Sequence, residues 1–162
     1  MNEINTTLIL KKAVILEQQG FSFYKNAAAM SSNSELIHIF ATMAAEEKNH
    51  SEILLNQLQQ LEHGKEEPIN LTNIPDEFTD AVLTDRIVNT ISAASYEAAA
   101  ISAAMGLEIQ TVNLYENSAD SAKTPEEEKL FRYLSNWEST HLKVLSNLNR
   151  KILERALQDD IY

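Results

Sequence analysis

Apolar residues recur every three or four positions in four long segments of the chain, and in each segment one such position holds a glutamate. The second segment runs from Leu36 to Leu61, and the fourth runs from Leu130 to Ile152. This spacing follows the 3.6-residue turn of an α-helix and predicts amphipathic helices. We expect helices over residues 5–31, 34–62, 95–121 and 125–157.

Residues with capping chemistry mark the ends of these helices. Thr124 suits the N-cap of the fourth helix, with a proline after it, and Glu127 would complete a capping box. Gly64 suits a left-handed cap at the end of the second helix. Residues 65–94 form the one long connection, which we expect to cross the bundle with a short helix near 77–90.

An internal repeat relates the two halves of the chain. A shift of 91 residues aligns 13–61 with 104–152 without a gap. The identical pairs include Leu16/Leu107, Glu17/Glu108, Tyr24/Tyr115, Asn26/Asn117, Phe40/Phe131, Glu47/Glu138, His50/His141 and Leu54/Leu145. The sequence therefore predicts an all-α four-helix bundle in one domain, 1–162, with helix pairs over 5–62 and 95–157 joined by the crossover 65–94.

Six polar residues occupy positions where the apolar stripes demand core residues. They are Glu17, Glu47, His50, Glu108, Glu138 and His141. Each histidine follows a glutamate by three residues, so both side chains lie on one helix face, one turn apart. Buried carboxylates repel one another and take up protons, whereas two divalent cations would cancel four negative charges. Carboxylate oxygen with imidazole nitrogen suits iron or manganese, and zinc is an alternative because the order of metal affinities favours it.

The repeat separates these residues from similar neighbours. Glu35 and His38 have the same three-residue spacing, but they lie about 120° around the helix from the stripe. Glu46 aligns with Trp137, whereas its neighbour Glu47 aligns with a glutamate, so the repeat selects Glu47 as the ligand. The alternative is a metal-free bundle in which buried glutamates and histidines bind one another.

Three further residues have simpler readings. We expect His38 and His63 to lie on the surface. Glu97 is expected to be a solvated acid at a helix start, or else part of a route for ions.

Composition narrows the functional classes. The chain has no cysteine, so disulfides, cysteine zinc sites and iron–sulfur clusters are excluded. A net charge of −11 argues against nucleic-acid binding. No apolar run approaches a membrane span, and the N-terminus lacks the form of a signal peptide, so we expect a soluble cytoplasmic protein.

The residues resemble the ferritin-like superfamily of di-iron carboxylate proteins, and the rubrerythrin-like branch in particular. The segments that carry the resemblance are LEQQGFSFYKNAA, AAEEKNHSEILL, LEIQTVNLYENSA and WESTHLKVL. The resemblance implies two iron ions, terminal carboxylates from Glu17 and Glu108, and bridging or chelating carboxylates from Glu47 and Glu138. It gives one metal to each of His50 and His141. It also implies that Tyr24 and Tyr115 hydrogen-bond to ligand carboxylates, although both could simply be core aromatics.

Two departures from that family stand in the sequence. There is no cysteine for a rubredoxin module, and Thr111 replaces the extra glutamate that rubrerythrins carry one turn after the third-helix ligand. The set of six ligands is instead similar to that of bacterioferritin.

The resemblance implies an oxidoreductase that reacts a di-ferrous site with hydrogen peroxide or dioxygen. An external electron-donor protein would then be required, and a homodimer is expected, with exchange of helices between subunits conceivable. The alternatives are a non-enzymatic iron-binding or storage protein, and a scaffold that keeps the bundle without metal.

Overall fold

The computed structural model describes residues 6–64 and 85–159, which form helices and no strands. The helices are α1 Thr6–Met30, α2 Ser34–Glu62, α3 Asp85–Thr90, α4 Tyr96–Asp120 and α5 Pro125–Asp159. The predicted all-α bundle is confirmed. Residues 77–84 of the expected crossover helix lie outside the described residues, and α3 begins after them. Within the described ranges, no helix is long and apolar enough to cross a bilayer.

Side-chain caps begin three of the long helices. The Asn33 carboxamide oxygen accepts hydrogen bonds from the first amides of α2, and the Ser95 hydroxyl accepts one in α4. Thr124 accepts from the amide of Glu127 at 3.2 Å, as expected. The Glu127 carboxylate closes the cap through the amide of Lys123, one residue before the amide of the usual capping box. Gly64 has φ 65°, the left-handed conformation expected beyond a helix end.

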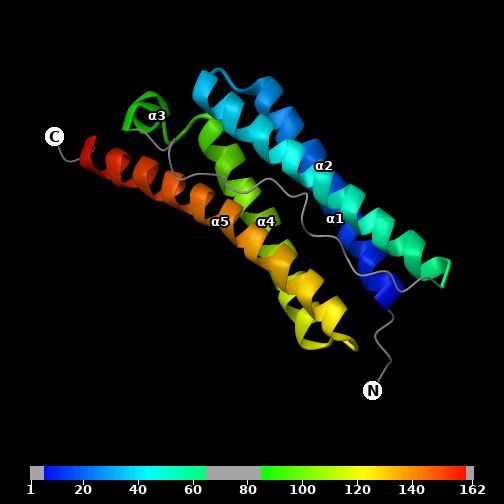
Figure 1. Cartoon of the computed structure of the whole chain (residues 1–162). Helices are drawn as coiled ribbons and strands as arrows, with labels where there is room; N and C mark the ends of the chain where they lie inside the picture. Colours follow the sequence, from blue (N-terminus) through cyan, green and yellow to red (C-terminus); the bar gives the residue numbers. More distant parts are fainter. Residues whose placement is uncertain (1–5, 65–84, 160–162) are drawn as a thin grey trace.

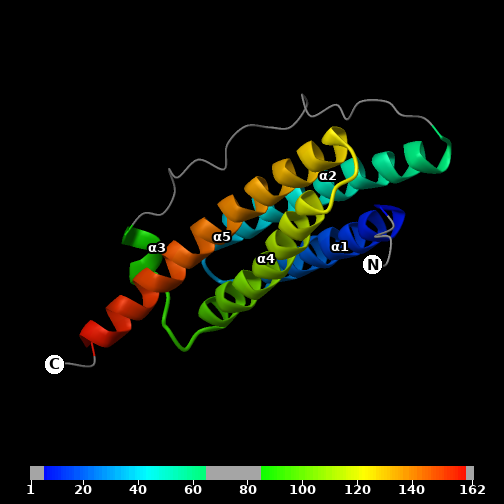
Figure 2. The same cartoon turned by 90° about the horizontal axis from the view of Figure 1, so that it is seen from below.

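The helices form two antiparallel pairs that correspond to the two halves of the repeat. α1 packs along α2, α4 packs along α5, and α1 also contacts α4. Figures 1 and 2 show the two pairs side by side, with α3 beside the C-terminal part of α5. Segments far apart in the chain therefore line a common interior.

The apolar core is divided into two clusters along the bundle. One includes Phe40, Ile101 and Leu148, and the other includes Leu10 and Leu134. In each of the four long helices, one end of the apolar stripe lies in the first cluster and the other end lies in the second. The polar residues of the stripes fall between these two clusters, where apolar side chains on both sides exclude water.

Glu97 ties the start of α4 to the connection between α1 and α2. Its side chain is buried and accepts hydrogen bonds from the amide of Ser32 at 2.9 Å and from the hydroxyls of Ser31 and Ser32. These hydrogen bonds, led by that of the amide, lower the pKa of Glu97 to about 2. The expectation of a solvated acid was wrong, because the loop supplies donors that α4 alone does not have.

Candidate metal centre

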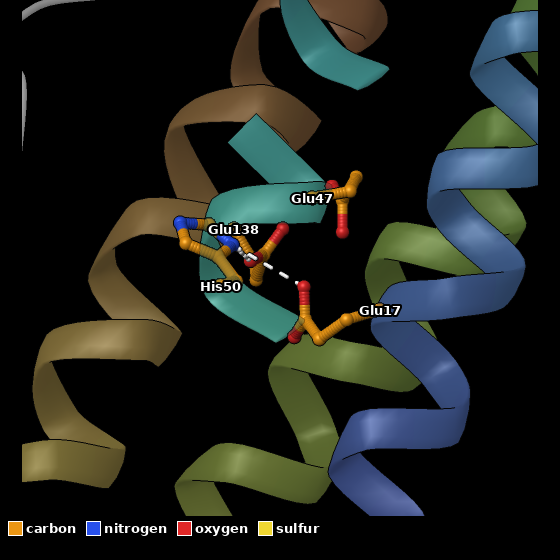
Figure 3. A group of neighbouring side chains, drawn as sticks. All are labelled: Glu17, Glu47, His50 and Glu138. Atoms are coloured by element: carbon orange, nitrogen blue, oxygen red, sulfur yellow. Dashed lines mark hydrogen bonds and ion pairs between the residues drawn. The ribbon is translucent and has the colours of Figure 1, made fainter. Parts of the chain in front are cut away.

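All six predicted ligand residues meet in the middle of the bundle, and each is at most 3% exposed. Glu17 comes from α1, Glu47 and His50 from α2, Glu108 from α4, and Glu138 and His141 from α5. Figure 3 shows how the side chains of Glu17, Glu47, His50 and Glu138 converge from three helices. The structure thus brings together residues as far apart in sequence as Glu17 and His141.

The side chains form two overlapping groups. Glu17, Glu47, His50 and Glu138 make one group, and Glu47, Glu108, Glu138 and His141 make the other. In each group, one candidate ligand atom per residue lies within 4.8 Å of all the others. Glu47 and Glu138 belong to both groups, so the arrangement offers two adjoining positions that share two carboxylates.

The ring nitrogens that face this centre follow the symmetry of the repeat. His50 Nδ1 lies 3.2 Å from Glu17 Oε2 and 2.8 Å from Glu138 Oε1. His141 Nδ1 lies 3.5 Å from Glu108 Oε1 and 3.3 Å from Glu47 Oε1. These two contacts of one histidine become those of the other on adding or subtracting 91 residues, and His141 Nδ1 also lies 3.3 Å from Glu138 Oε2. The two positions are therefore related by an approximate two-fold relation.

The two tyrosines connect the halves of the repeat. Tyr24 donates a hydrogen bond to Glu108, and Tyr115 donates one to Glu17. Each hydroxyl serves the carboxylate of the opposite half, rather than the glutamate two turns earlier on its own helix. Burial, followed by the neighbouring carboxylates, raises the pKa of both phenols, so both remain protonated donors.

The charges of the cluster conflict when no cation is present. Burial, with repulsion from Glu138, raises the pKa of Glu47 well above its usual range, and burial raises that of Glu108 to about 7. Burial would lower the pKa of His50, but the adjacent carboxylates, above all Glu138, raise it to about 10. Burial would likewise raise the pKa of Glu138, but the two histidines hold it below its usual range. In the metal-free protein, protons on these groups would therefore partly balance the charge of the carboxylates.

Unsatisfied atoms support a cation at this place. Glu47 Oε1 and both carboxylate oxygens of Glu138 are buried and form no well-aligned hydrogen bond with the described residues. Such orphaned oxygens are costly in an apolar interior, and a divalent cation would satisfy them. Carboxylate oxygens with one imidazole nitrogen per position form a donor set that suits iron.

Gly20 makes room for one of the shared carboxylates. A Cβ atom on Gly20 would lie 3.0 Å from Glu47 Oε2 and 3.1 Å from its Cδ. Sequence reasoning missed this role, although a glycine three residues after Glu17 on the same buried stripe was visible. Its repeat partner is Thr111, so the close approach occurs in one half only.

Glu46, which the repeat ruled out as a ligand, also contacts the site. Its Oε2 lies 2.5 Å from His141 Nε2, the ring nitrogen that faces away from the centre. In the sequence, only the position of Glu46 next to Glu47 pointed to this contact. No pattern distinguished Glu46 from a solvated acid.

A family model described as Rubrerythrin matches residues 9–149 of the chain. The chain belongs to the rubrerythrin family. Searches among curated proteins and among solved structures found no match. The rubrerythrin family implies a di-iron site, and the buried cluster of glutamates and histidines in this rubrerythrin fits a di-iron carboxylate protein. Its 162 residues contain no cysteine, so they hold no cysteine-ligated iron of the rubredoxin kind.

Proposed function

We propose that this rubrerythrin is an oxidoreductase that reduces hydrogen peroxide, or dioxygen, with a pair of iron ions. One observation carries the proposal. Two four-residue groups share Glu47 and Glu138 in a water-excluded centre, which would hold two ions side by side. Two adjacent ferrous ions can supply together the two electrons that turn one peroxide and two protons into two waters.

The chain's own residues have distinct parts in this proposal. One ion would be held by Glu17, Glu47, His50 and Glu138. The other ion would be held by Glu47, Glu108, Glu138 and His141. Tyr24 and Tyr115 orient the terminal carboxylates through their hydrogen bonds. The apolar clusters on both sides keep bulk water from the reacting oxygens.

Another molecule must return the electrons to the iron ions, because the 162 residues contain no cysteine that could hold a second iron centre. We propose an external electron-donor protein for this step and a homodimer as the working form. Size-exclusion chromatography with light scattering tests the homodimer, and a monomeric mass would contradict it.

Rapid mixing of the anaerobic Fe²⁺-loaded protein with hydrogen peroxide tests the reaction. We expect oxidation of two ferrous ions per peroxide, complete within seconds, and a loss of this reaction in His50→Ala. His38→Ala is the matched control, because His38 is an exposed histidine on the same helix. A ferrous spectrum that stays unchanged for minutes after peroxide is added would contradict the proposal.

Iron binding or storage without catalysis is the second candidate. The net charge of −11 favours it, because an acidic surface attracts cations. Iron titration separates the two candidates: two ions per chain support the oxidoreductase, whereas uptake of many ions per chain supports storage. If the protein binds no iron, the titration would support a metal-free scaffold, in which the buried glutamates and histidines bind one another instead of a metal.

A further inference from the structure

The two metal positions differ at the outer side of their histidines. The residue before each shared glutamate is Glu46 in the first half and Trp137 in the second, and the repeat aligns these two positions. The contacts of His50 with Glu17 and Glu138 are related by the repeat to those of His141 with Glu108 and Glu47, whereas this pair of residues differs.

His141 is anchored by a carboxylate. Its Nε2 lies 2.5 Å from Glu46 Oε2, and this contact joins α5 to α2. The imidazole is fully buried and the Glu46 side chain is 15% exposed. A carboxylate in this place fixes the ring orientation, keeps the proton on Nε2, and makes the inner nitrogen a stronger donor to a metal.

His50 lacks such an anchor. Its Nε2 is buried and has no hydrogen-bond partner among the described residues. The ring of Trp137 lies nearly perpendicular to that of His50, with centroids 5.5 Å apart and an interplanar angle of 85°. The indole Nε1 is itself buried without a partner in the same described part of the chain. Within residues 6–64 and 85–159, the outer nitrogen of His50 thus has no carboxylate like the one that Glu46 offers to His141.

We propose that the two metal positions are unequal, and that Glu46 is the positioning residue that makes the His141 position the tighter one, filled first. This inference rests on the proposed di-metal site and adds an order of occupancy to it. Loss of a hydrogen-bonding partner behind a metal ligand typically costs about 10- to 100-fold in affinity. The His141 position is therefore expected to bind its ion about 10- to 100-fold more tightly than the His50 position.

Titration with Co²⁺, in competition with a coloured chelator, tests the proposal without any turnover. The His50→Ala variant keeps the anchored position, and His141→Ala keeps the unanchored one. Adding Glu46→Gln to each completes a double-mutant cycle. In the His50→Ala background, we expect Glu46→Gln to lower the affinity for Co²⁺ about 10- to 100-fold. In the His141→Ala background, we expect the same substitution to change the affinity about 2-fold or less.

Glu52→Gln is the matched control for the loss of one charge. Glu52 lies on the same helix as Glu46, its side chain is 62% exposed, and it forms an ion pair with the surface residue Lys48 at 3.9 Å. We expect this control to leave both affinities unchanged. Circular dichroism of each metal-free variant verifies that it is folded.

The possible outcomes are distinct. Tighter binding by His50→Ala than by His141→Ala supports the proposal even if Glu46→Gln does not fold, whereas equal or reversed affinities overturn it. An equal effect of Glu46→Gln in both backgrounds also overturns it. Unequal binding without any reaction with peroxide contradicts the proposed function alone, and failure to bind Co²⁺ contradicts both.

Discussion

Replacement of Gly20 by alanine tests whether Glu47 needs the space beside α1. The added Cβ would lie 3.0 Å from Oε2, 3.1 Å from Cδ and 3.3 Å from Cγ of Glu47. Ordinary contacts of this kind begin at 3.4 Å, so the carboxylate must move by a few tenths of an ångström. Metal sites tolerate deviations of about 0.2 Å in ligand distance, so we expect this displacement to disturb both positions that share Glu47.

The expected size follows from comparable changes around metal ligands. A loss of about 10- to 100-fold in affinity corresponds to about 1.4–2.7 kcal/mol less stabilisation by saturating metal. In the metal-free protein the change has two opposed parts. Alanine favours a helix interior by about 0.5–1 kcal/mol over glycine, and overpacking costs about 1–3 kcal/mol. The difference between metal-loaded and metal-free stability removes both parts and isolates the effect on the ligand.

Urea unfolding with and without Co²⁺ measures that difference. Gly106→Ala is the matched control, because Gly106 lies in α4 with open space where its Cβ would be. We expect it to stabilise both forms by about 0.5–1 kcal/mol and to leave the metal increment unchanged. If Gly20→Ala keeps the full wild-type increment, the carboxylate does not need this space and the reasoning is refuted.

Three further predictions concern protons and hydrogen bonds. In the metal-free protein, the raised pKa values of His50 (about 10) and Glu108 (about 7) mean that the folded state binds more protons than the unfolded state. The stability of the metal-free protein should therefore decrease as the pH is raised from about 4.5 to 10. The stability of the Co²⁺-loaded protein should increase over the same range, because the ligands must lose protons to bind the metal. Urea midpoints measured at several pH values check these opposite slopes. Tyr24→Phe and Tyr115→Phe should each cost about 1.5–3 kcal/mol in the loaded protein, by loss of a hydrogen bond to a charged carboxylate. Similar losses are expected from the two variants, and a cost in only one of them would contradict the two-fold relation. Glu97→Ala should cost about 1–3 kcal/mol, because it leaves buried donors unpaired, and should not change the number of ions bound.

The sequence alone predicted the four long helices and the burial of the candidate ligand residues. Helical periodicity placed Glu17 and Glu108 on buried stripes, and the repeat put Glu47 ahead of Glu46 among the candidate ligands. Both arguments need only the geometry of a single helix. The structure gathers these residues in one centre, and that they bind iron stays a prediction.

Contacts between side chains of different helices could not be predicted from the sequence in this way. The sequence places each tyrosine two turns from a glutamate of its own helix, yet the rotation of α1 against α4 pairs it with the opposite one. The same limit hid the contact of Glu46 with His141 and the space left by Gly20. Such contacts depend on the relative rotation and distance of packed helices, which apolar periodicity does not fix.

The crossed tyrosine bonds make each half of the repeat dependent on the other. A hairpin of α1 and α2 alone has the Glu17 carboxylate but not the hydroxyl that binds it, and the α4–α5 hairpin has the corresponding deficit at Glu108. Each ion position also takes ligands from both hairpins. Docking of the hairpins and filling of the centre are therefore one equilibrium. A chelator would act first on the seam between the hairpins, where amide hydrogen exchange would rise before either hairpin unwinds.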